Sequence, residues 1–199
     1  MAAGSAGDGA SEASALAAMA AAPPGTVVPV AGNGTKGRER GPGALRRSCL
    51  EVPCSITLDR CGGATAFALS RTDTVLRLDL ATDAVAELPG LRYVRSVAVS
   101  PCGRRLWVAL ATRVCVYSLD ESPALREIAG SNICGFCDGV GDAAEFYRLE
   151  CIAVSRCGHM AFVSDCWNHR VRQLDLFGTA PAAVSTLAGS WKYARRDGF

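Results

Sequence analysis

Ten cysteines and two histidines are the residues of this 199-residue chain whose types could bind a metal or act as nucleophiles. The spacing nearest to a ligand pair is Cys134-Gly-Phe-Cys137, but a structural zinc site needs four ligands, usually from two such pairs. Cys151 and Cys157 occupy positions that an internal repeat explains better. We therefore interpret the cysteines as reduced thiols in loops and core, and predict no metal and no cofactor. A zinc or redox role for the Cys134–Cys137 pair is the alternative.

Composition limits the classes of function. Hydrophobic residues make up 49% of the chain and charged residues 20%, with a formal net charge of +2. This balance excludes a strongly basic nucleic-acid coat and an acidic solvating chain, and the apolar content excludes disorder throughout. No segment approaches the roughly 18 consecutive apolar residues of a membrane span, so we predict no membrane association.

The first 25 residues differ from the rest of the chain. They are mostly Ala, Gly and Ser, end in Pro23-Pro24-Gly25, and precede the first basic residue, Lys36. A secretory signal would need a positively charged start, and such small residues bury too little surface to offset chain entropy. We predict a disordered leader over residues 1–25 and a cytoplasmic location, with an unusual targeting peptide as the alternative.

A repeated pattern of short strands determines the predicted fold. Each copy begins with an alternating strand and a Cys-Gly turn, at Cys61-Gly62, Cys102-Gly103 and Cys157-Gly158. Glycine supplies the positive φ that such a tight turn requires. Second, third and fourth strands follow in each copy, and an extra copy of the fourth strand lies at 27–32.

Four short strands per copy, with turn residues repeated in register, are typical of β-propeller blades. Period-two alternation argues against a helical solenoid, and a flat sandwich would not repeat its turns. We predict an all-β propeller segment over residues 26–199, with four-stranded antiparallel blades at about 54–90, 96–130 and 151–189. Because propellers typically contain 4–8 blades, we expect a piece of a longer ring, with a homodimer of two three-bladed copies as the alternative.

The links between blades also repeat. Eight and nine residues after the Ala-Gly glycine that ends a fourth strand stand Asp138-Gly139 in one link and Asp197-Gly198 in the next. In an antiparallel blade, the turn between the second and third strands lies on the same face as the link to the next blade. The Cys-Gly turns lie on the opposite face. Rigid strands commonly present functional loops, so we expect the binding surface on the link face.

One segment carries a recognisable motif. Residues 163–172, Val-Ser-Asp-Cys-Trp-Asn-His-Arg-Val-Arg, together with Ala129-Gly130, Asp138-Gly139, Ala144 and Phe146, resemble the NHL repeat. The resemblance is specific over about 129–198 and partial over 26–128. It implies a six-bladed-type propeller, and some relatives with this repeat bind RNA.

We assign structural roles to the repeat signature, which comprises Asp165, Asn168, Arg170, Asp138 and Gly139. The short side chains of Asp165 and Asn168 should cap turn amides. Arg170 should pair with a carboxylate or a carbonyl of the neighbouring blade. We assign no catalytic residue.

The candidate binding residues are aromatic and basic side chains expected on the link face. They are Trp167, His169, Trp191, Lys192, Tyr193, Arg195 and Arg196. We predict a non-catalytic scaffold module that binds a protein or peptide partner. Basic residues beside aromatic ones also suit RNA, which is the alternative, although the link at 131–150 is acidic.

A second alternative is a metal-dependent hydrolase or lyase, because some propellers resembling this one hold a metal in the central channel. Such a site needs several inward-facing His, Asp, Asn or Glu residues from different blades. The chain has two histidines, and no carboxylate recurs at an inner-strand position, so we predict that it is not an enzyme.

Overall fold

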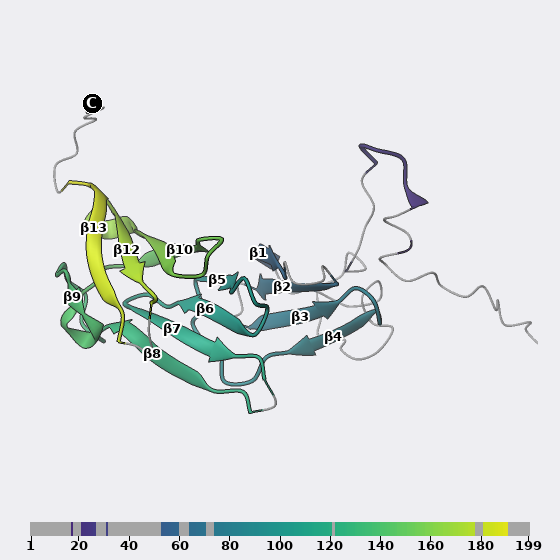
Figure 1. The fold of residues 1–199 in the computed structure, drawn as a ribbon, viewed down its shortest axis with the longest axis horizontal. Helices are drawn as coiled ribbons and strands as arrows, with labels where there is room; N and C mark the ends of the chain where they lie inside the picture. The colour runs from purple at the N-terminus through teal and green to yellow at the C-terminus, as the bar shows by residue number, and fades with distance from the viewer. Residues whose placement is uncertain are drawn as a thin grey trace, which may run out of the picture.

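The computed structural model describes residues 17, 21–26, 31, 53–59, 64–70, 74–120, 122–177 and 181–190. Within these ranges the named elements are β-strands and two short 3₁₀ helices, in three antiparallel sheets that follow the sequence order (Figure 1). No helix in the described ranges is both long enough and apolar enough to span a membrane. Most of residues 1–25, the strand expected at 27–32 except residue 31, and residues 191–199 lie outside the described part.

Each sheet is one blade. Blade 1 contains β1 (Pro53–Leu58), β2 (Thr65–Ser70), β3 (Val75–Asp79) and β4 (Ala84–Glu87). Blade 2 contains β5 (Ser96–Val99), β6 (Arg105–Ala109), β7 (Arg113–Ser118) and β8 (Leu125–Gly130). Blade 3 contains β10 (Leu149–Val154), β11 (Met160–Asp165), β12 (Arg170–Asp175) and β13 (Ala183–Gly189), with β9 (Gly139–Val140) along its outer edge.

The strand β9 is a departure from the expected four-stranded blade. It comes from the link between blades 2 and 3 and pairs antiparallel with β13, with Val140 opposite Ala183 and Gly139 opposite Val184. An unpaired outer strand would expose its backbone donors and acceptors, and β9 satisfies part of that edge. The link, which continues into the 3₁₀ helix η1 (Gly141–Ala143), is therefore partly built into blade 3.

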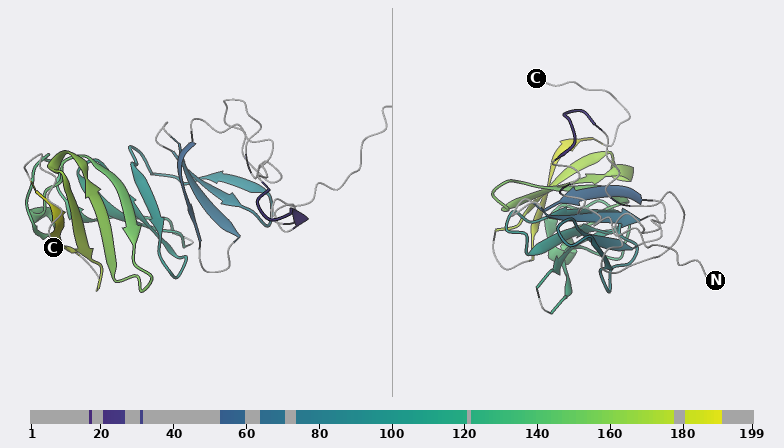
Figure 2. Two further views of the ribbon diagram at one scale, coloured as in Figure 1. Left: turned by 90° about the horizontal axis from the view of Figure 1, so that it is seen from above. Right: turned by 90° about the vertical axis from the view of Figure 1, so that its right-hand side faces the viewer.

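The three blades pack face to face, and their first strands lie next to one another (Figure 2). The strands β1, β5 and β10 line a groove of about 560 Å³ on the inner side of the arc. Two hydrogen bonds join blade 3 to blade 2. The N–H of Ile152 donates to the buried Ser96 hydroxyl at 3.2 Å, and the N–H of Leu149 donates to the carbonyl of Ala111 at 2.9 Å. These bonds fix the position of blade 3 against blade 2.

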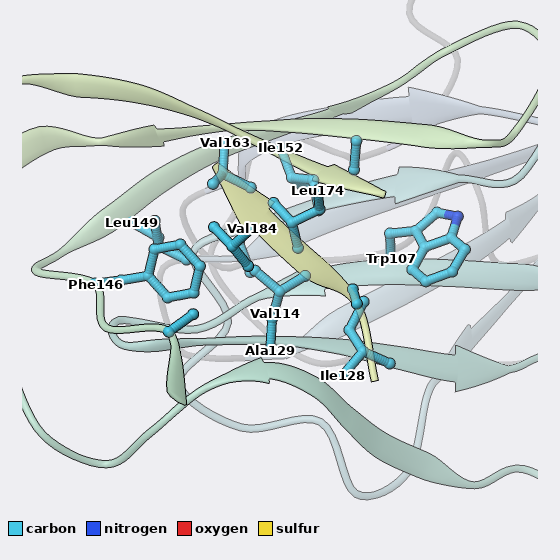
Figure 3. Packing of buried hydrophobic residues seen from close by; sticks show 14 of the residues in the cluster. Trp107, Val114, Ile128, Ala129, Phe146, Leu149, Ile152, Val163, Leu174 and Val184 are labelled. Carbon is cyan, nitrogen blue, oxygen red and sulfur yellow. The ribbon is translucent and has the colours of Figure 1, made fainter. Parts of the chain in front are cut away.

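An apolar core fills the space between blades 2 and 3 (Figure 3). Blade 2 contributes Trp107, Val114 and Ile128, and blade 3 contributes inward residues of its alternating strands, such as Val163 and Leu174. Burying a side chain of this size contributes about 1.5–3 kcal/mol. The middle strands of blade 2 are therefore rich in apolar residues on both faces, because blade 1 covers one face and blade 3 covers the other.

The face of blade 3 that is turned away from blade 2 also carries apolar side chains, but they are exposed. Val171 is 39% exposed and Leu187 is 55% exposed. Counted from the strand ends, these residues correspond to Val114 and Ile128 of blade 2, which blade 3 covers completely or nearly so. This face is thus shaped like the one that receives a neighbouring blade.

Two equivalent glycines explain why Ala-Gly recurs at the ends of fourth strands. Gly130 and Gly189 have φ values of +95° and +96°, which L side chains rarely adopt. A Cβ at Gly130 would collide with the carbonyl oxygen of Thr112, and one at Gly189 with that of His169. The outer strand therefore approaches the turn between the second and third strands more closely than any side chain allows.

We expect Gly130→Ala and Gly189→Ala to lower the free energy of unfolding much more than Gly90→Ala does. Gly90 ends the fourth-strand segment of blade 1 with a φ of +75°, but nothing lies within 4 Å of the position that a Cβ would take there. Gly90→Ala should therefore cost only the strain of a positive φ in a residue with a Cβ, about 1–2 kcal/mol of the free energy of unfolding. In the other two variants, neighbouring backbone atoms must also shift to make room for the Cβ. Urea denaturation followed by circular dichroism measures the differences. Equal losses in all three variants would show that the close approach is unimportant.

Candidate functional site

The link face is organised around one buried cation, Arg172 of β12. Its guanidinium donates to the Asp165 carboxylate at 2.8 Å and to the Asp138 carboxylate at 2.7 Å. It also donates to the carbonyls of Cys137 at 2.7 Å and Glu145 at 3.1 Å. The side chains of Arg172 and Asp165 are completely buried. Charge-assisted bonds of this kind are strong, and the planar fork of arginine can serve several acceptors at once.

This cluster joins the link to the blade. Asp165 ends β11, whereas Asp138, Cys137 and Glu145 belong to the link that precedes blade 3. Burial works to raise the pKa of Asp138, but hydrogen bonds from Arg172 and Thr186 and the charge of Arg172 outweigh it and hold the pKa below its ordinary value. The carboxylate is therefore ionised at neutral pH, which the pairing with Arg172 requires.

The neighbouring polar residues extend the same network. The carboxylate of Asp165 accepts the backbone N–H of Tyr147 at 2.8 Å and the side-chain amide of Asn168, also at 2.8 Å. Asn168, in the 3₁₀ helix η2 (Cys166–Asn168), donates onward to the carbonyl of Gly135 at 2.8 Å. Asp165 and Asn168 thus bind each other and groups of the link rather than the backbone amides of their own turn, which corrects the expected capping role.

Arg170 also differs from the expectation. Its guanidinium donates to the carbonyl of Asn168 at 2.7 Å, within its own blade, and lies 3.8 Å from the centroid of the Phe136 ring. Arg170 thus binds a carbonyl of its own blade rather than a carboxylate or a carbonyl of the neighbouring blade, and the ion pairs with carboxylates are made by Arg172. Both arginines lie on the same face of β12, because side chains two residues apart point the same way. Arg172 lies within the strand beside the buried Leu174, whereas Arg170 is the first residue of the strand and is half-buried.

Aromatic and basic side chains lie on the surface that this network supports. Trp167 is 49% exposed, packs edge-on against Tyr147 at 4.7 Å between ring centroids, and has the Arg148 guanidinium 5.1 Å from its ring. We define the link-face patch by six residues. They are Tyr93, Phe136, Tyr147, Arg148, Trp167 and Arg170.

Tyr93 and Arg148 hold equivalent positions one blade apart. Each stands three residues before the position where Ser96 and Cys151 align in the repeat. Both have a positive φ, +58° for Tyr93 and +63° for Arg148, which costs a non-glycine residue about 1–3 kcal/mol. Tyr93 is also 73% exposed. Backbone strain that presents an exposed aromatic ring is commonly found at functional sites.

The structure describes only part of the predicted site. Trp167 and His169 lie together at the turn after β11, and His169 is exposed with a φ of +55°. Trp191, Lys192, Tyr193, Arg195 and Arg196 lie outside the described residues. Sequence reasoning missed Tyr93, Arg148 and Arg172. The repeat register could have indicated the first two, and a charged residue at an inward strand position could have indicated the third.

The remaining chemistry-bearing residues form no metal centre within the described ranges, where no three or more His, Cys, Asp or Glu side chains are grouped to hold an ion. Cys134 and Cys137 are exposed free thiols in the link. Their loop forms isolated bridges with Phe146 and Glu145. This segment provides the carbonyls that Asn168 and Arg172 bind.

Comparisons with known proteins support the fold. No protein-family model matches the chain, and no curated protein matches it. An auxiliary nutrient binding protein from Bacteroides ovatus superimposes with a TM-score of 0.56 at 15% identity, over 69% of this chain and 36% of its own. A chain of a nidogen/laminin complex superimposes with a TM-score of 0.54 at 18% identity, over 70% of this chain and 49% of its own. Hydrazine synthase from Kuenenia stuttgartiensis superimposes with a TM-score of 0.51 at 22% identity, over 79% of this chain and 39% of its own.

The chain thus spans about a third to a half of the length of these solved structures. At such identities the likeness concerns the fold alone. Four-stranded antiparallel sheets, packed face to face with adjacent first strands, define a β-propeller segment of about three blades, as the repeat predicts.

We expect Arg172→Met to lower the free energy of unfolding by about 3–5 kcal/mol, because it leaves the buried Asp165 carboxylate without its cation. Arg170→Met is the matched control, two residues away on the same strand. Arg170→Met should lower the free energy of unfolding by only about 1 kcal/mol, because it removes one hydrogen bond and one ring contact at a half-buried position. Denaturant unfolding of both variants measures the contrast. Similar losses would contradict the central position of Arg172.

Proposed function

We propose that this chain is an NHL-type propeller segment that binds a protein or peptide through the link-face patch, without catalysing a reaction. The observation that carries the proposal is the exposed Trp167, whose turn is held by the buried ionic bonds around Arg172. The exposed Tyr93 adds a second aromatic ring at the link before blade 2. Exposed aromatic and arginine side chains on a rigid support are the residues that dominate the binding energy of protein interfaces. The segment at 163–172, with its NHL-like sequence, contributes two of the six residues of this patch, Trp167 and Arg170.

The arrangement favours partners with a particular chemistry. Tyr93 and Trp167 offer flat apolar surface, and Arg148 adds a guanidinium beside the Trp167 ring. Arg92 and Arg95, which flank Tyr93 at close range, are also exposed. A peptide with apolar side chains and nearby carboxylates would complement both features.

The fold occurs in other binding proteins. The solved structures that share it include an auxiliary nutrient binding protein and a nidogen/laminin complex. These names describe those proteins, and they support a binding role here only through the common fold. The RNA alternative, the homodimer and the cytoplasmic location stay predictions.

A peptide library displayed on phage and selected on the purified protein tests the proposal. We expect the selected peptides to lose about tenfold or more in affinity for Tyr93→Ala and Trp167→Ala, which corresponds to hot-spot aromatics of about 1.4 kcal/mol or more each. Phe177→Ala is the control, because Phe177 is 75% exposed but follows β12 on the opposite face.

Two outcomes would count against this proposal. Peptides that bind all three variants equally would place the binding surface elsewhere. A protein that selects no peptides but retains single-stranded RNA, with affinity that falls steeply as salt rises, would favour the RNA alternative.

A further inference from the structure

A small cleft lies between blade 2 and the turn that follows β12 of blade 3, at the end of the blades opposite the link face. Its volume is about 30 Å³, and its lining includes Arg105, Trp107 and Arg126 of blade 2 with Asp175, Phe177 and Pro181 of blade 3. The N–H of Ala182 donates to the carbonyl of Ile128 at 2.9 Å and joins the two sides of the cleft. Because a single water needs about 10–15 Å³ of such space, the cleft admits a small polar group rather than a whole ligand.

The indole N–H of Trp107, in the wall of this cleft, has no acceptor. Trp107 is only 7% exposed, and its Nε1 is buried without a hydrogen-bond partner among the described residues. Figure 3 shows this nitrogen turned away from the labelled apolar residues of the core. A buried indole N–H normally has a partner, and an unpaired one calls for an explanation. We interpret it as a donor for an acceptor that the chain itself does not provide.

Two arginines flank the indole on the same face of blade 2. Arg105 stands two residues before Trp107 on β6, so both side chains point toward blade 3. Arg126 of β8 is opposite Val116, which is itself opposite Trp107. Blade 3 adds the carboxylate of Asp175 to the lining. Two arginines and one aspartate give the cleft a formal charge of +1, which favours a ligand with one negative charge.

The repeat shows that a blade does not need these donors for its packing. In the strand register, the residues of blade 3 that correspond to Arg105, Trp107 and Arg126 are Met160, Phe162 and Ser185. A long apolar side chain and a plain aromatic ring therefore suffice at the first two positions. The guanidinium groups and the indole N–H are additions that belong to blade 2, at the cleft.

The mouth of the cleft adds apolar surface. Phe177 is 75% exposed, and its ring packs edge-on against His159 at 4.9 Å between ring centroids. Pro181, in the same turn, is also exposed. Residues 178–180 lie outside the described ranges and form no part of the site as defined. A ligand held by its polar head in the cleft would place its remaining atoms against Phe177 and Pro181.

We propose that the cleft binds the carboxylate of a small apolar acid that carries a single negative charge. The carboxylate accepts the indole N–H of Trp107 and a guanidinium N–H of Arg105, and the apolar body lies against Phe177. Both oxygens of a carboxylate accept hydrogen bonds, and bonds from a guanidinium are charge-assisted and strong. The negative charge of Asp175 disfavours a second charge on the ligand, so that a dianion binds less well.

This site is separate from the proposed peptide site. Arg105 begins β6 and Asp175 ends β12, and both strand ends lie on the face opposite the links. The link-face patch contains neither residue. Binding of a small carboxylate can therefore fail while peptide binding holds, and the reverse is equally possible.

Titration of the ¹⁵N-labelled full chain with sodium benzoate, at constant ionic strength, tests the proposal. The chain has three tryptophans, and the indole resonance that is lost in Trp107→Phe identifies Trp107. We expect this resonance to shift to saturation with a Kd of about 1 mM or tighter, which a ligand of so few atoms can reach. The indole resonance of Trp167, in the link-face patch, should not move.

Two arginine variants provide a matched comparison. Arg105→Met copies the residue of blade 3 at the equivalent position, and it should raise the Kd for benzoate about fivefold or more by removing the charged donor. Arg104→Met is the control, because Arg104 is the adjacent exposed arginine and does not line the cleft. Its Kd should change less than about twofold, since an exposed charge outside the site is screened by water and salt.

Two further ligands separate a carboxylate site from weaker explanations. Benzamide has the same ring without the charge, and sulfate is a dianion, so neither should shift the Trp107 resonance to saturation in the same range. Equal binding of benzamide or sulfate, or equal losses in both arginine variants, would overturn the proposal. So would the absence of a saturable shift at about ten times the expected Kd of benzoate, which would leave the indole N–H to a water.

Discussion

The ionic cluster around Arg172 is the constraint on which the link face depends. A buried guanidinium must be matched by acceptors, because an unpaired charge away from water is costly. Asp165 provides one acceptor from the blade, and Asp138 with two link carbonyls provides the others. The charge balance of one buried side chain therefore determines where the link lies.

The binding surface follows from that position. Tyr147 is held through its amide by Asp165, and the amide of Trp167 donates to the Tyr147 carbonyl at 3.1 Å. Trp167, Tyr147 and Arg148 then pack against one another at the surface, with the Tyr147 and Trp167 rings edge-on. A patch built in this way is ordered before a partner arrives, so that binding orders few side chains.

The repeat in the sequence predicted the architecture well, because strand alternation and the Cys-Gly turns are local signals. It could not predict β9, since the pairing of Val140 with Ala183 depends on an edge left open by the rest of blade 3. It also assigned the contact with a carboxylate or a carbonyl of the neighbouring blade to Arg170 and none to Arg172, because the motif does not show which of two arginines on one face of a strand is buried. Tyr93 was missed because its exposure and positive φ arise from backbone geometry. The sequence also does not show that a side chain at Gly130 or Gly189 would collide with a neighbouring carbonyl oxygen.

Hydrogen–deuterium exchange of Arg172→Lys tests the account most directly. Lysine keeps the charge but cannot bind two carboxylates and two carbonyls as a planar fork. The account predicts that the link amides of Cys137 and Glu145, which bond each other's carbonyls, and the Trp167 amide exchange about tenfold faster or more, while Val108 in blade 2 stays protected. Unchanged protection of the link would contradict the claim that Arg172 holds the link face in place.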